Sequence, residues 1–136
     1  MIQTATNNLE QYYETVLEKG KILSNNQAKA WSKAVLNTMG LDMSRSLKKE
    51  LAKALPEELG EQLGRLFWLI HFRNTNVTIA EFSEAVARRS GHSDQHFAKV
   101  PITAVFHALK QLVDTDLSNK VADDLSPELR EIWKNA

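Results

Sequence analysis

The chain matches itself without gaps when it is shifted by 70 residues, and this internal match limits the folds that are open to it. The shift places Glu14 on Glu84 and Val16 on Val86. Most matched positions are apolar and recur at helical spacing, so the shared content is chiefly a core pattern. We interpret the match as two related halves, about 9–63 and 79–133, the alternative being similar amphipathic patterns of independent origin. Further identical pairs are Ala28/Ala98, Lys29/Lys99, Ala34/Ala104, Val35/Val105, Leu47/Leu117, Ala52/Ala122, Leu55/Leu125, Glu58/Glu128, Leu59/Leu129 and Glu61/Glu131.

Each half has the signals of consecutive helices. Capping patterns at 24–27 and 78–81 predict two helix starts, Ser126-Pro127 predicts a third, and Ser93 is the expected cap of a fourth. Pro56 is expected to end one helix and open the next, whereas Pro101 falls inside a predicted helix and should kink it or delay its start. No stretch alternates as a β-strand does. The sequence therefore predicts an all-α fold, a single bundle of about seven or eight helices.

The segment 56–73 differs from the other predicted helices, because it is apolar on nearly every side. Its normal stripe includes Leu59 and Leu63, and Trp68 and Phe72 add apolar surface on other faces. We expect a central helix through which the two halves share one core, the alternative being an exposed face used for dimerisation. Residues 1–7 are expected to be disordered, and residues 8–136 to form a single all-helical domain.

Composition excludes several classes of protein. The chain has 136 residues, with 17 basic and 17 acidic side chains, so it has no net attraction to nucleic acid or anionic lipid. It has no cysteine, and its longest apolar run, 66–70, is too short to cross a bilayer. The first residues lack the basic and apolar stretches of a secretory signal. These features predict a cytoplasmic protein without a membrane span, for which nucleic acid is an unlikely partner.

The histidines do not form a convincing metal site. His92 and His96 stand four residues apart, but His92 precedes the expected cap at Ser93, outside the helix, and no third ligand accompanies the pair. His107 is expected at the edge of the core, and His71 suggests no role. We therefore predict no metal and no cofactor.

Neither do the acidic pairs suggest catalysis. Glu57 and Glu58 follow Pro56 in a first helical turn, where negative charge suits the helix dipole. Asp123 and Asp124 are expected on a solvated face near a helix end. No phosphate-binding loop or nucleophile motif is present, so we do not expect an enzyme.

One charge feature is a candidate for partner binding. The predicted third helix of the first half is basic, whereas its equivalent in the second half is acidic, and an acidic partner or a second copy could bind the basic face. Ordinary solvated surface is the alternative. The candidate basic face consists of Arg45, Lys48, Lys49 and Lys53, and the candidate acidic face consists of Asp114, Asp116, Asp123 and Asp124.

These patterns resemble a known family. An aromatic residue four positions before valine (Tyr12 to Val16, Phe82 to Val86) and the Leu-Pro-Glu-Glu-Leu ending at Leu59 are similar to the bacterial domain of unknown function 2267. The resemblance covers about 9–133 and implies a small all-helical protein of two related halves. It implies no catalytic residues. The second half departs from the pattern, since its proline is shifted by one position, at Pro127, and Pro101 interrupts a helix.

Two functional hypotheses follow. The first is a non-catalytic, cytoplasmic protein-interaction module that docks a protein partner or a second copy of itself. The alternative is a helical bundle that binds a small apolar ligand or cofactor between its halves, near Trp31, Trp68, Phe72 and Phe106. Nucleic-acid binding through 45–53 is a weaker third possibility, since one basic helix supplies few phosphate contacts.

Overall fold

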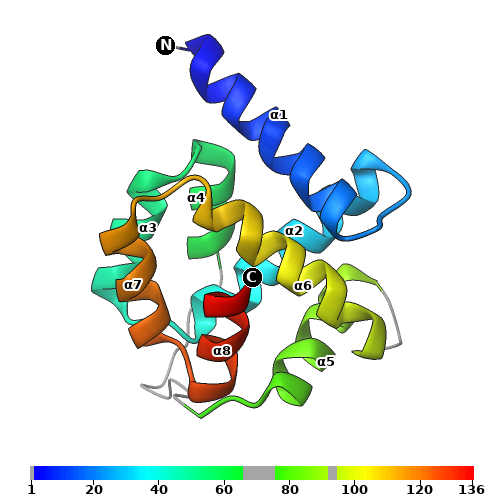
Figure 1. Ribbon diagram of the computed structural model, residues 1–136, viewed down its shortest axis with the longest axis vertical. Helices are drawn as coiled ribbons and strands as arrows, with labels where there is room; N and C mark the ends of the chain where they lie inside the picture. The colour runs from blue at the N-terminus through cyan, green and yellow to red at the C-terminus, as the bar shows by residue number, and fades with distance from the viewer. Residues whose placement is uncertain (1, 66–75, 92–94) are drawn as a thin grey trace.

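A computed structural model describes residues 2–65, 76–91 and 95–136 (Figure 1). The regular secondary structure of these ranges is all α-helix, as the sequence predicts. None of the helices in the described ranges is long and apolar enough to span a membrane. The eight helices of these ranges are α1 (Ile2–Lys19), α2 (Asn25–Leu41), α3 (Arg45–Ala54), α4 (Glu57–Gly64), α5 (Ile79–Ser90), α6 (Gln95–Lys110), α7 (Thr115–Asp124) and α8 (Pro127–Asn135).

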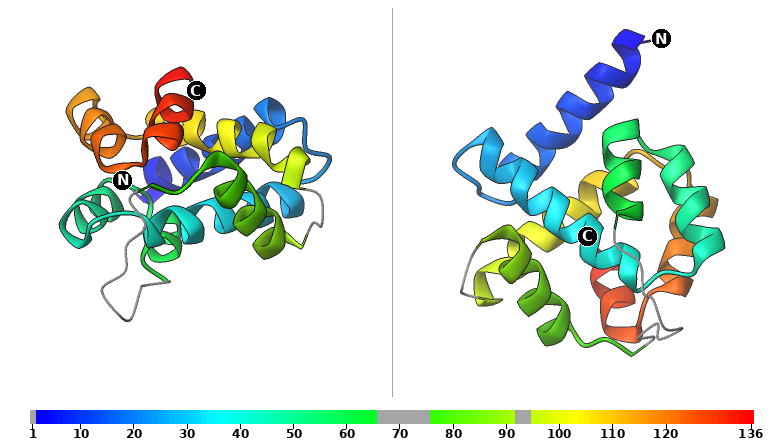
Figure 2. Two further views of the ribbon diagram at one scale, coloured as in Figure 1. Left: turned by 90° about the horizontal axis from the view of Figure 1, so that it is seen from below. Right: turned by 180° about the vertical axis from the view of Figure 1, so that it is seen from behind.

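The helices form two series with the same spacing. Helices α2, α3 and α4 begin at residues 25, 45 and 57, and α6, α7 and α8 begin at 95, 115 and 127, which is 70 residues later in each case. The packing has the same correspondence, because α1 packs against α6 whereas α5 packs against α2. Helices α2 and α6 pack against each other across the middle of the molecule (Figure 2). Helix α1 therefore corresponds to α5, and α2 to α6, so the contact of α1 with α6 is the equivalent of the contact of α5 with α2.

Local capping explains why the helices begin where they do. The Ser24 hydroxyl accepts a hydrogen bond from the Gln27 amide at 3.2 Å, and Thr78 and Glu81 form a complete capping box. Ser126 accepts from the Leu129 amide, with Pro127 at the first helical position. These three predicted helix starts are confirmed. Ser93, the fourth, lies outside the described residues.

The core gathers around α2 and α6. Phe106 of α6 is fully buried, and its ring contacts those of Phe82 and Trp133, with centroids 6.1 and 5.2 Å away. Two neighbouring tyrosines of α1 bring polar groups into this interior. The Tyr12 hydroxyl lies 2.6 Å from Ser32 Oγ, and Tyr13 donates to Glu58 Oε2 at 2.5 Å. Burial raises the pKa of both phenols, so they remain protonated and able to donate.

Three features differ from expectation or fall beyond what the structure describes. Helix α6 continues through Pro101 rather than starting after it, although proline removes one helical hydrogen bond, to the carbonyl of Phe97. Helix α1 begins at Ile2, within the stretch expected to be disordered, and residues 2–7 contain no proline or glycine to stop it. Helix α4 ends at Gly64, and the rest of the expected central helix, with Trp68 and Phe72, lies outside the described residues.

Two glycines allow helices to approach closely. A Cβ atom built on Gly40 of α2 lies 2.0 Å from the Leu63 carbonyl oxygen of α4. A Cβ atom on Gly60 lies 2.8 Å from the Ala52 carbonyl oxygen of α3. Both neighbours are backbone atoms, which cannot move aside without shifting a helix.

Gly40→Ala is therefore expected to lower the free energy of unfolding by about 2 kcal/mol or more, because the added methyl overlaps the backbone of α4. Urea denaturation followed by circular dichroism measures the change. Gly64→Ala is the matched control, since no described atom lies within 4 Å of its Cβ position, and we expect it to be neutral or slightly stabilising. Equal losses in both variants would contradict this account of Gly40.

Helices α3 and α7 lie side by side and join the two series (Figures 1 and 2). Asp124, at the end of α7, accepts a hydrogen bond from the Ser44 amide at 2.8 Å. Ser44 is the N-cap residue of α3 but makes no side-chain cap bond, and the carboxylate of Asp124 pairs instead with the Ser44 amide, another of the unpaired donors at the start of α3. Lys120 and Glu50 add an exposed ion pair at 3.2 Å.

Asp124→Ala is expected to reduce the free energy of unfolding by about 1 kcal/mol, the usual cost of losing a helix cap. Asp123→Ala removes the same charge from the neighbouring exposed position and is expected to change stability by less than about 0.5 kcal/mol. Thermal and urea unfolding of the two variants provide the comparison. If both variants lose the same stability, general electrostatics rather than the bond to Ser44 is responsible.

Candidate functional site

An apolar hollow lies between the α1–α2 loop and the first half of α6. We call it the α6 groove; its volume is about 510 Å³. Its floor includes Trp31, which is 5 % exposed, and the buried Pro101. The residues that line the groove are Gly20, Lys21, Ile22, Leu23, Gln27, Trp31, His96, Phe97, Val100 and Pro101.

Three apolar side chains of the groove are open to solvent. Leu23 is 92 % exposed, Phe97 70 % and Val100 47 %, and no other large hydrophobic side chain in the described part of the chain is exposed. Isolated exposed hydrophobics are common on protein surfaces, but a cluster of them around a hollow is typical of a binding surface. The α6 groove is therefore the candidate functional site.

The turn between α1 and α2 positions one side of the groove. Lys21 has a left-handed backbone with φ 53°, and the Ile22 amide donates to the Leu17 carbonyl at 2.9 Å. The turn packs Ile22 against the core, while Leu23 remains exposed immediately before the Ser24 cap. Short-range backbone bonds thus hold Leu23 beside the groove.

A second, smaller hollow adjoins the groove at Val100. Its volume is about 350 Å³, and Lys19, Lys99, His107 and Asn135 are among the residues that line it. No Asp or Glu of the described ranges lines either hollow. The apolar groove therefore has basic side chains next to it.

The basic residues predicted for partner binding all lie on α3, away from the groove. Arg45, Lys49 and Lys53 are exposed. Lys48 is half-buried, and its Nζ donates to the Gly40 carbonyl at 3.2 Å, near the end of α2. Burial lowers the pKa of Lys48, and the charge of Arg45 lowers it further. Lys48 thus has a structural contact of its own.

The acidic residues lie on α7 or at its start, directly beside α3. Asp114 caps α7 through the Leu117 amide at 2.8 Å, Asp124 binds the Ser44 amide, and Asp116 and Asp123 are exposed. The two candidate charged faces are therefore neighbours within one molecule. A hollow of about 380 Å³ between them is lined by Glu50, Lys120, Asp123 and Asp124, among others.

The histidines that the structure describes do not lie together in one site. His96 lines the α6 groove, and His107 is half-buried with its Nε2 atom 3.3 Å from Gln111 Nε2. His71 and His92 lie outside the described residues. Within the ranges that the structure covers, no group of three or more His, Cys, Asp or Glu side chains could hold a metal ion.

The residues named for an apolar ligand are in different environments. Trp31 forms part of the groove floor, whereas Phe106 fills the core between Phe82 and Trp133. Trp68 and Phe72 lie outside the described residues.

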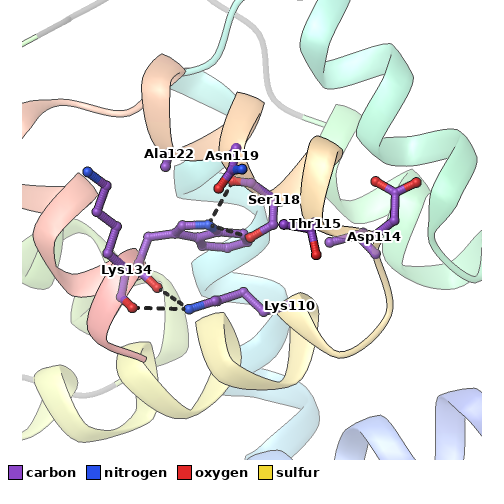
Figure 3. A pocket seen from close by; sticks show the side chains of 9 residues that line it. Lys110, Asp114, Thr115, Ser118, Asn119, Ala122 and Lys134 are labelled. Atoms are coloured by element: carbon purple, nitrogen blue, oxygen red, sulfur yellow. Dashed lines mark hydrogen bonds between the residues drawn. The ribbon is translucent and has the colours of Figure 1, made fainter.

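A polar pocket of about 320 Å³ between α7 and α8 is lined by side chains that already bond within the chain (Figure 3). The Trp133 indole donates to the carbonyl and hydroxyl oxygens of Ser118 at 3.1 and 3.2 Å. Lys110 Nζ donates to the carbonyls of Trp133, Lys134 and Ala136 and so caps the end of α8. These side chains hold helices together, so this pocket is a weaker candidate than the groove.

Reasoning from sequence missed the α6 groove, because Phe97 and Val100 fit the apolar pattern of a core helix. The internal match contains a signal that could have revealed them. At the 70-residue offset Phe97 corresponds to Gln27 and Val100 to Ala30, and both of these are exposed on α2. An apolar residue aligned with a polar one, as Phe97 is with Gln27, indicates a surface position.

No curated protein matches this chain. One family model, described as an uncharacterized conserved protein (DUF2267), matches residues 9–132. The match spans nearly the whole chain and all the described helices except the ends of α1 and α8. The chain therefore belongs to the DUF2267 family.

Proposed function

We propose that this protein is a non-catalytic, cytoplasmic protein-interaction module and that the α6 groove is its docking surface. The observation that carries the proposal is the gathering of Leu23, Phe97 and Val100, the exposed large hydrophobics of the described chain, around one hollow. Covering a large apolar side chain contributes about 1.5–3 kcal/mol, so three of them supply a substantial part of the affinity of a modest complex.

The groove suits a protein partner better than a buried cofactor. It is open to solvent along α6, and Leu23, Phe97 and Val100 are exposed rather than enclosed in a cavity. Interfaces characteristically combine an apolar centre, often aromatic, with a polar rim. Phe97 and Trp31 provide the aromatic centre, and Lys21, Gln27 and His96 provide polar groups around it.

We also propose that the two series of helices are copies of one duplicated unit. The common 70-residue spacing of the helix starts and the reciprocal packing of α1 on α6 and α5 on α2 support it. In this view the groove is a feature of the second copy, since α2 carries Gln27 and Ala30 at the positions of Phe97 and Val100.

Site-specific photocrosslinking in the native host tests the docking surface. A crosslinking amino acid at position 97 is expected to capture a partner, whereas one at Lys49, exposed on α3, is not. The captured protein is then purified and its affinity for the chain is measured. We expect Phe97→Ser to weaken the reconstituted complex about tenfold or more and Lys49→Ser by less than about twofold.

Two results would count against the proposal. Capture from position 49 but not 97 assigns docking to the basic face of α3. Native mass spectrometry that shows a bound small molecule, lost in Phe97→Ser, makes the groove a ligand site instead. Because both substituted side chains are exposed, unchanged circular dichroism and melting temperature serve as the control for folding.

A further inference from the structure

The surface beside the α6 groove carries an excess of positive charge, and this excess restricts what the groove can bind. Lys21 lines the groove itself, and Lys19 and Lys99 line the adjoining hollow that meets it at Val100. All three lysines are exposed, and among the residues that the structure describes no Asp or Glu lines the two hollows. This local excess of positive charge occurs in a chain whose net charge is zero.

We infer that the groove binds an amphipathic helix of a partner protein whose apolar face is flanked by Asp or Glu residues. The inference rests on the proposed function and deepens it by naming the partner's chemistry. Apolar side chains of the partner helix enter above Trp31 and Pro101, and its carboxylates lie near Lys21, Lys19 and Lys99. Opposite charges around an apolar contact set the orientation and increase the association rate.

The spacing of the exposed side chains fits a helical occupant. Phe97 and Val100 stand three residues apart on α6, and so lie next to each other along one side of that helix. Leu23 approaches from the loop, so the apolar surface has two sides with a floor between them. A helix bound in such a groove inserts residues spaced at i, i+3, i+4 and i+7.

A second copy of the chain fits this surface poorly. Two grooves facing each other would oppose Lys19, Lys21 and Lys99 with the same lysines, which disfavours a symmetric dimer. No other described face has an exposed large hydrophobic side chain that could enter the groove of another copy.

A membrane surface also fits it less well. Trp31 and Pro101 are buried at the floor of a concave groove, which a lipid headgroup layer cannot follow as a single side chain can. Three lysines contribute only about 1 kcal/mol each near an anionic bilayer.

The test uses the purified full chain and three designed helical peptides of about 15–20 residues, long enough to form a helix. All three share a leucine face, and their flanking residues are Glu, Gln or Lys. We expect the Glu peptide to bind about tenfold more tightly than the Lys peptide, with the Gln peptide between them. Added salt should bring the Glu peptide towards the affinity of the Gln peptide, because screening weakens exposed charge pairs. Fluorescence anisotropy measures the three affinities.

Variants of the chain separate the apolar contribution from the charged one. Phe97→Ser is expected to weaken all three peptides about tenfold. Lys99→Glu is expected to weaken the Glu peptide about threefold or more and to reduce its salt dependence, to strengthen the Lys peptide, and to leave the Gln peptide nearly unchanged. Lys53→Glu makes the same charge change on α3 and is the matched control, with less than about twofold effect on any peptide.

Equal binding of the Glu and Lys peptides, or an equal effect of Lys53→Glu and Lys99→Glu, overturns the inference. So does the absence of peptide binding together with sedimentation on vesicles of anionic phospholipid, which identifies a membrane surface. A concentration-dependent dimer that Phe97→Ser abolishes makes a second copy the occupant.

If crosslinking from position 97 captures a partner through a segment that is not an acidic helix, this inference fails while the proposed interaction module stands. If position 97 captures nothing, both fail.

Discussion

The packing of α1 and α5 across both helical series is the constraint on which the rest of the structure depends. Helix α1 packs on α6 as well as on α2, and α5 packs on α2 as well as on α6, so these two helices join the series to each other. Val16 of α1 and its counterpart Val86 of α5 are both fully buried by this arrangement. Separating the series would return these faces to water at about 25 cal/mol for each Å² of apolar surface. About 65 residues bury too little surface to fold robustly alone, so we expect the two series to unfold together.

The positions of the helices could be predicted from sequence because their signals are local. A hydroxyl three residues before an amide, as Thr78 stands to Glu81, specifies a helix start with no knowledge of the rest of the chain. The bond between Asp124 and Ser44 is different, since it joins residues 80 positions apart. Nothing in the sequence near either residue indicates that the two are in contact. Asp124 was therefore predicted to be a surface carboxylate. Lys48 is a similar case, because only the folded chain brings its ammonium group to the carbonyl of Gly40.

The side-by-side packing of α3 and α7 also changes the meaning of their opposite charges. In the sequence, the basic and acidic helices suggested a basic face that meets an acidic partner or the acidic face of a second copy. In the structure they are neighbours, joined by the Ser44–Asp124 bond and the Lys120–Glu50 pair. Because the opposite charges of α3 and α7 lie close together, each helix offsets much of the electrostatic field of the other at distances comparable to the Debye length. Within the described part of the chain, no acidic side chain lines the hollows beside which Lys19, Lys21 and Lys99 lie.

Folding of the isolated chain does not account for Phe97 and Val100. Phe97 is 70 % exposed, so most of its apolar surface stays in water when the chain folds and contributes little to stability. The corresponding positions of α2, Gln27 and Ala30, are also exposed, which indicates that a polar or small residue satisfies the fold equally well there. A phenylalanine at such a position adds a tendency to self-associate without adding stability. The free energy that its ring can contribute is realised only when a second molecule covers it, and the flanking lysines favour one that carries carboxylates.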